Sequence, residues 1–301
     1  MRMSEASKRM RKEWLQNDNE RDKDLKTPDD VERFDNLSYG SDPDWNTLDV
    51  YRPKNKKGEI LPVIVIVHGG GWVYGTTKTY QFYGMYLAQQ GFAVVSYNYR
   101  LAPEHKYPAS FEDSAAVMRW IYENAAEYGL DVNNIFLAGD SAGGMMACII
   151  TSIVTDPEYA ALYPTVHFPA GFRPNALLLN CGSYKLFKED GSFLSGTDGD
   201  LIHDLIDDEH FVEYKDRITV VKHINNNFPP AYIMTAQGDF LREQAPLLVK
   251  EYEKNHLEFV YRMYGDADDP LFHVFHVTIY NPVAIRCNLE ECAFAREYIK
   301  K

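Results

Sequence analysis

Short apolar runs alternate with segments of helical periodicity along most of the chain, and this alternation constrains its fold more than any other feature. The strongest run, Leu61–Val67 (LPVIVIV), is continuously apolar and rich in β-branched residues, as in a strand buried on both faces. Strands that alternate with helices of ten or more residues form a parallel sheet with helices on both faces. We therefore predict an α/β fold with a mostly parallel central sheet. The other expected strands are Thr47–Tyr51, as an edge strand, Gly91–Tyr97, Asn134–Ala138, Ala176–Asn180, Ala231–Thr235 and Phe259–Tyr264.

Capping signals predict where two of the helices begin. One helix is expected from Ser110 to about Glu127, because Ser110 and Asp113 form an S-x-x-D capping signal. Asn288 and Glu291 have the same spacing and predict the start of a C-terminal helix.

Two regions interrupt the alternation. Residues 1 to about 45 are highly charged and carry only a sparse apolar stripe, Met3, Met10 and Trp14, at helical spacings of seven and four. From this pattern alone, a solvated arm and a helix that docks on the rest of the chain are equally consistent. Residues 185–228 are polar, rich in Asp and Asn, and carry no strong strand, which indicates an insertion at one end of the sheet.

Composition and charge narrow the class of protein. A chain of 301 residues with 45% hydrophobic content can bury a large core within a single α/β domain. The formal net charge of −13 disfavours nucleic acids and anionic lipid surfaces as partners. No apolar run approaches the ~20 residues that span a bilayer, and the basic start is not followed by the apolar stretch of a secretory signal. We expect a cytoplasmic protein without stable membrane association, in which four cysteines without zinc-site or CxxC spacing stay reduced: Cys148, Cys181, Cys287 and Cys292.

The pentapeptide Gly139–Gly143 (GDSAG) has the form G-x-S-x-G. It follows an expected strand and opens an apolar helix, Ser141–Thr155, as the nucleophile turn of a serine hydrolase requires. Glycines suit a sharp turn in which side chains would collide with neighbouring backbone. Such a turn holds Ser141 clear of the sheet as a nucleophile and directs the N–H of Ala142 at negative charge on the substrate oxygen. The alternative is a glycine-rich strand-to-helix turn that only packs.

The segment His68–Trp72 (HGGGW) directly follows the strongest expected strand. Backbone without side chains lets two N–H groups approach the oxyanion of a tetrahedral intermediate. We therefore predict that two of Gly69, Gly70 and Gly71 donate to the oxyanion, and we expect His68 to brace the loop. The rivals are a flexible loop and a phosphate-binding loop, but the latter needs G-x-G-x-x-G or a following G-K-[ST].

A serine hydroxyl becomes a good nucleophile only when a base takes its proton, and the base needs an acid to orient it. On a strand–turn–helix scaffold of this kind the chain order is Ser, then Asp or Glu, then His. Asp239 comes just after the expected strand Ala231–Thr235 and is our candidate acid, with a helix N-cap as the alternative role. Two candidate bases, His273 and His276, follow the last expected strand.

Three sequence blocks carry a family resemblance: HGGGW, YRLAPEHKYPA at Tyr99–Ala109, and GDSAGG at Gly139–Gly144. In this order they resemble the hormone-sensitive lipase-like branch of the α/β-hydrolase fold, also called bacterial esterase family IV, over the chain from about Thr47 to its end. The resemblance implies an α/β-hydrolase domain of residues 46–301 with a small helical cap, formed by residues 1–45 and the insertion at 185–228. It favours the docked helix at the N-terminus.

The same resemblance bears on the acid and the base. The family's motif D-x-L-R-D-E is similar to Asp239–Gln244 (DFLREQ), which keeps the leading acid and alters the two trailing ones. Family members usually have His-Gly-Phe at the base. His273 begins HVF, which fits with Val in place of Gly, whereas His276 begins HVT and fits worse. We therefore predict His273 as the base and a buried core position for His276.

Other residues have weaker patterns. Trp72, Tyr74 and Asp140, beside the two glycine motifs, are predicted to contact substrate, although aromatic residues near such a loop are as often packing residues. A tight group of acids and histidines could bind a metal, but a solvated acidic helix is the more common arrangement, and the chemistry predicted here needs no metal or other cofactor. This group comprises His203, Asp204, Asp207, Asp208, Glu209 and His210.

Together these residues predict ester hydrolysis through an acyl-enzyme, with Ser141, Asp239 and His273 as the catalytic triad. The resemblance implies small-molecule esters with short acyl chains, roughly acetate to hexanoate. The alternatives are an amidase or peptidase with the same triad, a deacetylase of sugars such as xylan, and a ligand-binding receptor on a hydrolase scaffold. Receptors of this kind usually lack a triad member, and all three members stand in this chain. Dimerisation is common among similar proteins, so a homodimer is a further expectation.

Overall fold

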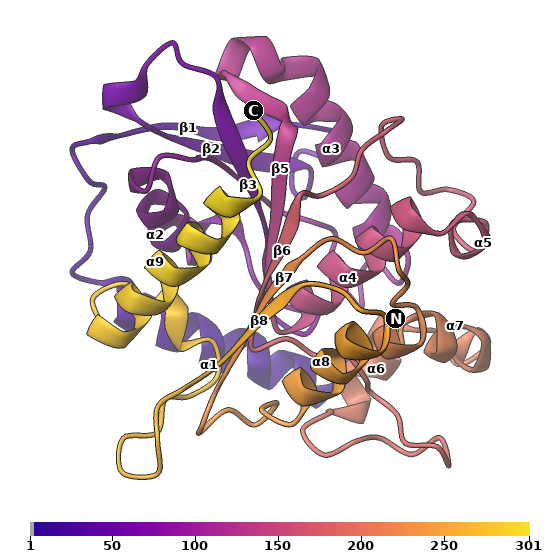
Figure 1. Ribbon diagram of the computed structural model, residues 1–301. Helices are drawn as coiled ribbons and strands as arrows, with labels where there is room; N and C mark the ends of the chain where they lie inside the picture. Colours follow the sequence, from indigo (N-terminus) through magenta and orange to yellow (C-terminus); the bar gives the residue numbers. More distant parts are fainter. Residues whose placement is uncertain (1–2) are drawn as a thin grey trace.

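A mixed sheet runs through the centre of the computed structural model, which describes residues 3–301 (Figure 1). Its strand order within these residues is β1-β2-β4-β3-β5-β6-β7-β8. The pairs β1·β2 and β2·β4 are antiparallel, and all other neighbours are parallel. The mostly parallel sheet predicted from the alternation is therefore confirmed. The strands are β1 (Val31–Ser38), β2 (Thr47–Pro53), β3 (Leu61–Val67), β4 (Ala93–Tyr97), β5 (Leu130–Asp140), β6 (Ala176–Asn180), β7 (Ala231–Ala236) and β8 (Phe259–Tyr264).

Helices cover both faces of this sheet, as Figure 1 shows. Alternate residues of β3 point into two separate cores: Val63 and Val65 pack with α3, α4 and α8, whereas Ile64 and Ile66 pack with α2 and α9. Burial on both faces explains why β3 reads as a continuous apolar run. The longer helices are α1 (Glu5–Asp22), α2 (Thr77–Gln89), α3 (Ala109–Tyr128), α4 (Ala142–Thr155), α8 (Gln244–Lys254) and α9 (Pro282–Glu297), and the shorter ones are α5 (Pro157–Ala160), α6 (Gly199–Leu205) and α7 (Phe211–Arg217).

The charged N-terminal segment forms a docked helix and a strand. Helix α1 contacts α6 of the 185–228 insertion, where the backbone N–H of Ser4 and the hydroxyl of Ser7 both donate to Asp204. Arg11 fixes the middle of α1 through a bidentate ion pair with Glu104. Residues 31–38 add β1 to the sheet outside β2, so the expected edge position of Thr47–Tyr51 is wrong. The segment of residues 1–45 that we assigned to a cap thus also completes the sheet, and the division into cap and catalytic domain stays a prediction.

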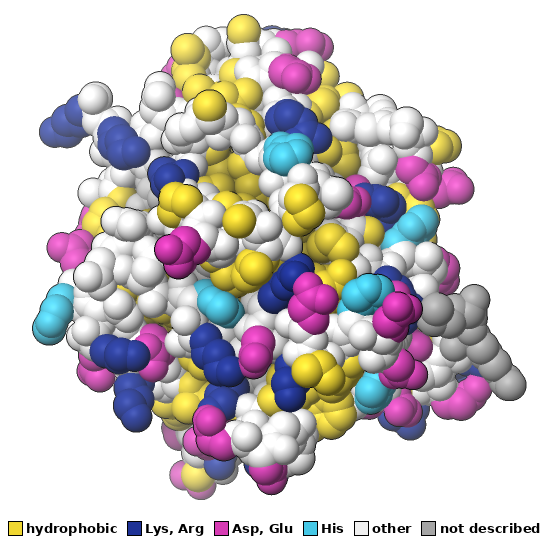
Figure 2. Space-filling view, turned by 90° about the vertical axis from the view of Figure 1, so that its right-hand side faces the viewer, with side chains coloured by type: hydrophobic (Ala, Val, Ile, Leu, Met, Phe, Trp, Pro, Cys, Tyr) yellow, Lys and Arg dark blue, Asp and Glu magenta, His cyan; other side chains and the backbone are white. Residues whose placement is uncertain are grey.

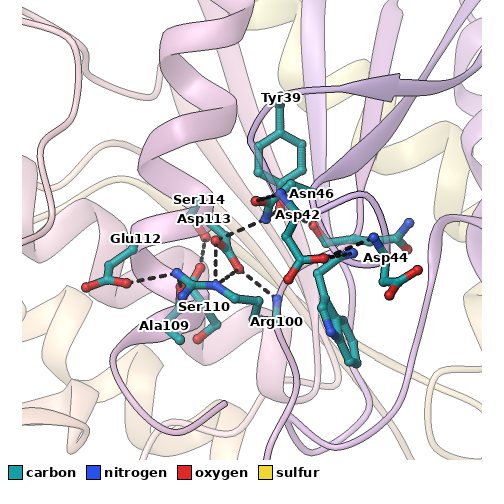
Figure 3. A network of polar contacts seen from close by, with 12 residues as sticks. Tyr39, Asp42, Asp44, Asn46, Arg100, Ala109, Ser110, Glu112, Asp113 and Ser114 are labelled. Atoms are coloured by element: carbon teal, nitrogen blue, oxygen red, sulfur yellow. Dashed lines mark hydrogen bonds and ion pairs between the residues drawn. The ribbon is translucent and has the colours of Figure 1, made fainter. Parts of the chain in front are cut away.

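Both predicted capping signals are wrong, because their carboxylates are buried in other networks. Helix α3 begins at Ala109, and the carboxylate of Asp113 accepts from the backbone N–H and the guanidinium of Arg100, with the amide of Asn46 on its other side (Figure 3). Helix α9 begins at Pro282, and Asn281 caps it by accepting from two backbone N–H groups. Asn288 and Glu291, predicted to start this helix, lie buried inside it.

The surface carries charge of both signs. On the face shown in Figure 2, acidic and basic side chains are interspersed, so the net charge of −13 does not gather there into one patch.

Among residues 3–301, no helix combines the length and the apolar character that crossing a bilayer requires. The four cysteines are buried and unpaired in this part of the chain.

Candidate active site

The loops that carry the predicted site leave the sheet at one edge. HGGGW follows β3, and GDSAG overlaps the last two residues of β5 and continues into α4. These two strands are parallel neighbours, with Val67 opposite Gly139. Asp239 follows β7 and His273 follows β8, which are also parallel neighbours. Because the carboxyl ends of parallel strands meet at the same edge, the fold brings segments about 200 residues apart in the sequence to one place.

Ser141 lies on the sharp turn between β5 and α4. Its backbone has φ +52° and ψ −120°, a combination that L residues rarely adopt and that surrounding structure must hold in place. A side chain on Gly143 would collide with the carbonyl oxygen of Val67, and one on Gly139 would collide with the carbonyl oxygen of Gly143. The two glycines therefore let α4 start directly against β3, which leaves Ser141 at the base of a cavity.

Asp239 and His273 form a hydrogen bond of 2.7 Å between Oδ1 and Nδ1. Asp239 also accepts from the backbone N–H of Leu241 at 2.8 Å and from the hydroxyl of Thr235 at 3.1 Å. Burial alone would raise the pKa of Asp239, but the hydrogen bond and positive charge of His273 together with the Leu241 bond lower it below its usual value. The carboxylate thus stays ionised beside the ring. Helix α8 begins only at Gln244, so Asp239 does not occupy its N-cap.

The Nε2 atom of His273 has no hydrogen-bond partner among the described residues, and His273 lines the same cavity as Ser141. Catalytic hydrogen bonds are often long without substrate and tighten only when it binds. Nε2 is therefore the ring atom that is free to serve the serine hydroxyl.

His276 has a different environment. Its ring is buried, lies edge-on to Tyr83 at 5.0 Å between centroids, and makes no hydrogen bond to residues 3–301 through either nitrogen. Burial, with the positive charges of His273 and Arg21, lowers the pKa of His276 to about 3, so the ring is neutral. The structure therefore pairs Asp239 with His273 and leaves His276 in the core.

Hydrogen bonds to buried side chains fix the start of the glycine loop, Gly69–Gly71. The N–H of Gly69 donates to Asp140 Oδ1 at 3.1 Å and to the hydroxyl of Tyr80 at 3.0 Å, so it already has two acceptors. The N–H groups of Gly70, Gly71 and Ala142 have no acceptor within the described part of the chain. These three N–H groups are thus available to a ligand at Ser141.

Two buried side chains brace this loop. His68 stacks on Tyr99 with 4.1 Å between ring centroids, and its Nδ1 lies 2.7 Å from the carbonyl oxygen of Gly69. Burial lowers the pKa of His68 to about 4, so it is neutral. Asp140 accepts from Tyr80 at 2.7 Å, and burial raises the pKa of Asp140 to about 6 despite this bond. Both carboxylate oxygens of Asp140 therefore hold the loop, and because Asp140 also lines a cavity at Ser141, its contact with substrate stays a prediction.

Replacing Tyr80 with Phe tests whether this bracing matters. The variant loses the hydroxyl that bridges Gly69 and Asp140, so we expect kcat to fall about tenfold with little change in KM, because the oxyanion donors are displaced. Tyr97→Phe is the matched control, since it removes a buried hydroxyl bonded to Ser114 away from the loop. Chemical denaturation should show a similar loss of stability in both variants, and an equal loss of kcat in the control would contradict this role.

Two cavities meet at Ser141. The larger, of about 980 Å³, is lined by α1, by the segment 271–281 and by Tyr74, Asp140 and His273. The smaller, of about 270 Å³, is lined by Gly71, Trp72 and Ala142, with α1 and α6 on its other side. Trp72 and Tyr74 thus line different cavities. The hydroxyl of Tyr74 donates to Asp18 of α1 at 2.6 Å.

The sequence patterns missed most of the residues that close these cavities. Trp14 and Phe240 line both of them, and Met10 and Leu201 line the smaller one. Met10 and Trp14 belong to the sparse apolar stripe of the N-terminal segment, which is the one signal that could have identified them. Phe240 follows the acid directly and lies 4.3 Å from the His273 ring between centroids.

Potential metal ligands gather at one place among the described residues. Cys181, Asp239 and His273 offer three atoms within 4.8 Å of one another. His273 already bonds Asp239, and burial raises the pKa of the Cys181 thiol well above its usual value, so the thiol stays protonated. These three side chains therefore suit the hydrogen-bonded Asp239–His273 pair better than a metal site. The acidic group at 203–210 does not converge in this way, and Asp204 is buried against α1 rather than solvated.

A protein family described as "alpha/beta hydrolase fold" matches residues 64–277. The chain belongs to this family. The match covers both glycine motifs, the acid and the base, and it confirms the fold and the hormone-sensitive lipase-like branch that the three sequence blocks predicted.

Several proteins of this fold are similar to the chain. Carboxylesterase NlhH of Mycobacterium tuberculosis is 33% identical over 197 residues, which are 61% of this chain and 58% of NlhH. Arylacetamide deacetylase of Bos taurus is 35% identical over 115 residues, 36% of this chain and 29% of that protein. The matched region thus spans about three fifths or less of these relatives. The crystal structure of esterase B from Lactobacillus Rhamnosis has a TM-score of 0.84 and 28% identity, and covers 98% of this chain and 95% of its own.

Proposed function

We propose that this protein is a serine carboxylesterase that hydrolyses small esters with short acyl chains through an acyl-enzyme. One observation carries the proposal: the Asp239–His273 pair opens on the same cavity as Ser141, whose turn is flanked by three N–H groups without acceptors in the described residues. Similar proteins named carboxylesterase and esterase support the reaction class.

Each residue then has one role. Ser141 Oγ attacks the ester carbonyl carbon while His273 Nε2 takes its proton, and Asp239 orients the ring through Nδ1–H. The oxyanion accepts from the N–H groups of Ala142 and the Gly70–Gly71 loop, each worth ~3 kcal/mol in the transition state. His273 next protonates the leaving alcohol oxygen, which leaves an acyl group on Ser141. A water molecule repeats the sequence and releases the acid.

The direction of proton transfer indicates which cavity receives the alcohol part of the ester and which receives the acyl chain. The alcohol oxygen must lie within reach of His273 Nε2, and of the two cavities described the larger alone is lined by His273. The alcohol therefore occupies the larger cavity, and the acyl chain extends from the oxyanion donors into the smaller one.

The smaller cavity limits the acyl chain. A methyl group on Gly71 would meet Leu201 Cδ1 at 3.2 Å and Met10 Sδ at 3.5 Å, so both side chains overhang the oxyanion loop. With about 270 Å³ against about 980 Å³ for the larger cavity, it is also the smaller space of the two. Similar proteins fit a short acyl chain: one is named versiconal hemiacetal acetate esterase, and a structure of esterase B is inhibited by a tributyrin phosphonate.

A panel of chromogenic esters from acetate to decanoate tests the proposal. We expect kcat/KM to be highest between acetate and hexanoate and to fall for longer chains. Met10→Ala enlarges the smaller cavity and should move the optimum toward longer chains by about two carbons, at ~0.8 kcal/mol for each buried methylene. Leu25→Ala is the matched control, because Leu25 lines only the larger cavity among the two described and should leave the acyl optimum unchanged.

The possible outcomes distinguish a failure of the esterase proposal from a failure of the cavity assignment. A folded wild-type protein that turns over no ester contradicts the esterase proposal. Turnover with an acyl optimum that moves in Leu25→Ala and not in Met10→Ala contradicts only the assignment. The name of arylacetamide deacetylase makes amide hydrolysis the second candidate, and turnover of an anilide without turnover of the matching phenyl ester would favour it.

A further inference from the structure

A buried carboxyl group lies beneath the nucleophile turn, outside the residues assigned to the reaction. Glu291 of α9 is completely buried, and it accepts from the hydroxyl of Tyr83 at 2.6 Å and from the side-chain amide of Asn180 at 3.0 Å. Within residues 3–301 it forms no ion pair, so hydrogen bonds alone compensate its burial. Buried acidic groups are uncommon unless they are paired or have a specific function.

Asn180 connects this carboxyl group to the nucleophile. It is the last residue of β6, lies opposite Asp140 in the sheet, and accepts from the backbone N–H of Ser141 at 3.1 Å through its own carbonyl oxygen. One residue thus bonds the strained turn with its backbone and Glu291 with its side chain. A residue in a rarely adopted conformation persists only where its surroundings determine it from several sides.

We propose that Glu291 is a positioning residue for Ser141: its carboxyl group fixes Asn180, and Asn180 fixes the backbone of the nucleophile turn. Tyr83 holds the carboxyl group from α2 and completes the support. This inference rests on the proposed function in so far as Ser141 is the nucleophile.

The surroundings of Glu291 keep it protonated up to neutral pH. Burial raises its pKa to about 7, against the two hydrogen bonds that lower it, and the negative charge of Asp140 raises it further. The other ionisable groups nearby are Tyr83, Tyr232 and the thiols of Cys287 and Cys292, none of which is a cation, and His276 beside Tyr83 is neutral. The ionised carboxylate accepts both bonds, whereas the protonated group accepts from Asn180 with one oxygen and donates its own O–H to Tyr83, whose hydroxyl then becomes the acceptor. Glutamine can make the same two bonds.

Two substitutions separate hydrogen bonding from the filling of space. Glu291→Leu keeps the bulk and removes both bonds, and we expect kcat for a short-chain ester to fall about tenfold with KM within about twofold, because the turn loses its support. Glu291→Gln should retain most of kcat. Glu290→Leu is the matched control, since the neighbouring Glu290 bonds Tyr232 and Tyr264 but no residue of the turn. Unchanged kcat in Glu291→Leu, or an equal loss in Glu290→Leu, would overturn the proposal.

Two further readouts apply if Glu291→Leu does not fold. Tyr83→Phe removes the bond to Glu291 and a longer one, of 3.4 Å, that the Tyr83 hydroxyl accepts from the side-chain amide of Asn180, but it leaves the bond between Asn180 and Glu291. It should lower kcat about threefold, and no loss would count against the proposal. The folded pKa of Glu291 lies above its unfolded value, so the native state is progressively penalised as pH rises from about 4.5 to 7. The Tm of the wild type should therefore fall relative to Glu291→Gln by about 3 °C or more between pH 5 and pH 8.

A constant difference in Tm across this pH range would overturn the protonation of Glu291. This readout needs no substrate, so it stands apart from the esterase proposal. If the wild-type protein turns over no ester, the proposed function fails. If it does and Glu291→Leu retains full kcat, only the positioning role fails.

Discussion

Replacing His273 with alanine is expected to lower kcat/KM for a short-chain ester by about 10⁴- to 10⁶-fold, the range seen when a triad base is removed. The variant loses the atom that takes the proton of Ser141, and no other ring replaces it, because both nitrogens of His276 are buried in the core. The measurement is kcat/KM for wild type and variant on the same ester. A residual rate above hydroxide hydrolysis is expected from the oxyanion donors alone.

The control for this experiment is His276→Ala. We expect it to retain activity within about tenfold while it lowers the free energy of unfolding by ~2–4 kcal/mol, since a buried ring next to Tyr83 is lost and a cavity remains. Circular dichroism and a denaturant titration separate the two effects. Loss of activity in His276→Ala with activity retained in His273→Ala would show that the assignment of the base is wrong.

The buried parts of the fold could be predicted from the sequence, because burial leaves a strong local pattern. The bounds predicted for Leu61–Val67, Ala176–Asn180 and Phe259–Tyr264 are those of β3, β6 and β8. The edge strand Val31–Ser38 (VERFDNLS) was missed, since its residues are mostly half-buried or exposed and it lies in a charged segment. A strand of this kind is fixed by pairing with β2, which no local pattern encodes.

The two wrong capping signals have a common cause in tertiary contacts. An S-x-x-D or N-x-x-E pattern describes spacing within four residues, whereas the structure buries Asp113 against Arg100 and Glu291 against Tyr83 and Asn180, partners that lie outside these patterns. In the same way, three consecutive glycines look equivalent in the sequence. Only the tertiary contacts of Asp140 and Tyr80 show that the N–H of Gly69 is already bonded.

Residues with special backbone requirements were the easiest to place. Gly143 and Ser141 lie in a motif whose spacing reflects steric limits of the turn itself, so the strand before it and the helix after it were sufficient to locate the turn. The walls of the larger cavity come mainly from α1 and the segment 271–281, and those of the smaller one from α1 and the 185–228 insertion, segments that lie outside the regular alternation of strands and helices. Their pattern is correspondingly weak.

Removal of the Ser141 hydroxyl should give the largest loss of activity, and two variants that lack it should differ from each other in stability. Both Ser141→Ala and Ser141→Gly lack the nucleophile, so we expect kcat to fall by about 10⁵- to 10⁶-fold in each. Alanine keeps a Cβ atom at φ +52° and ψ −120°, whereas glycine adopts this conformation without steric cost.

The two variants should therefore differ in stability although they are equally inactive. Relief of strain is worth ~1–3 kcal/mol, and the greater freedom of glycine in the unfolded chain takes back ~0.5–1 kcal/mol, so Ser141→Gly should be more stable than Ser141→Ala by about 1 kcal/mol. Denaturant titration of wild type and both variants at one pH measures this difference. A Ser141→Gly variant that is less stable than Ser141→Ala by ~0.5–1 kcal/mol would mean that the turn stores no strain at this position, because only the unfolded-chain effect of glycine would remain. Retained ester hydrolysis in either variant would exclude Ser141 as the nucleophile.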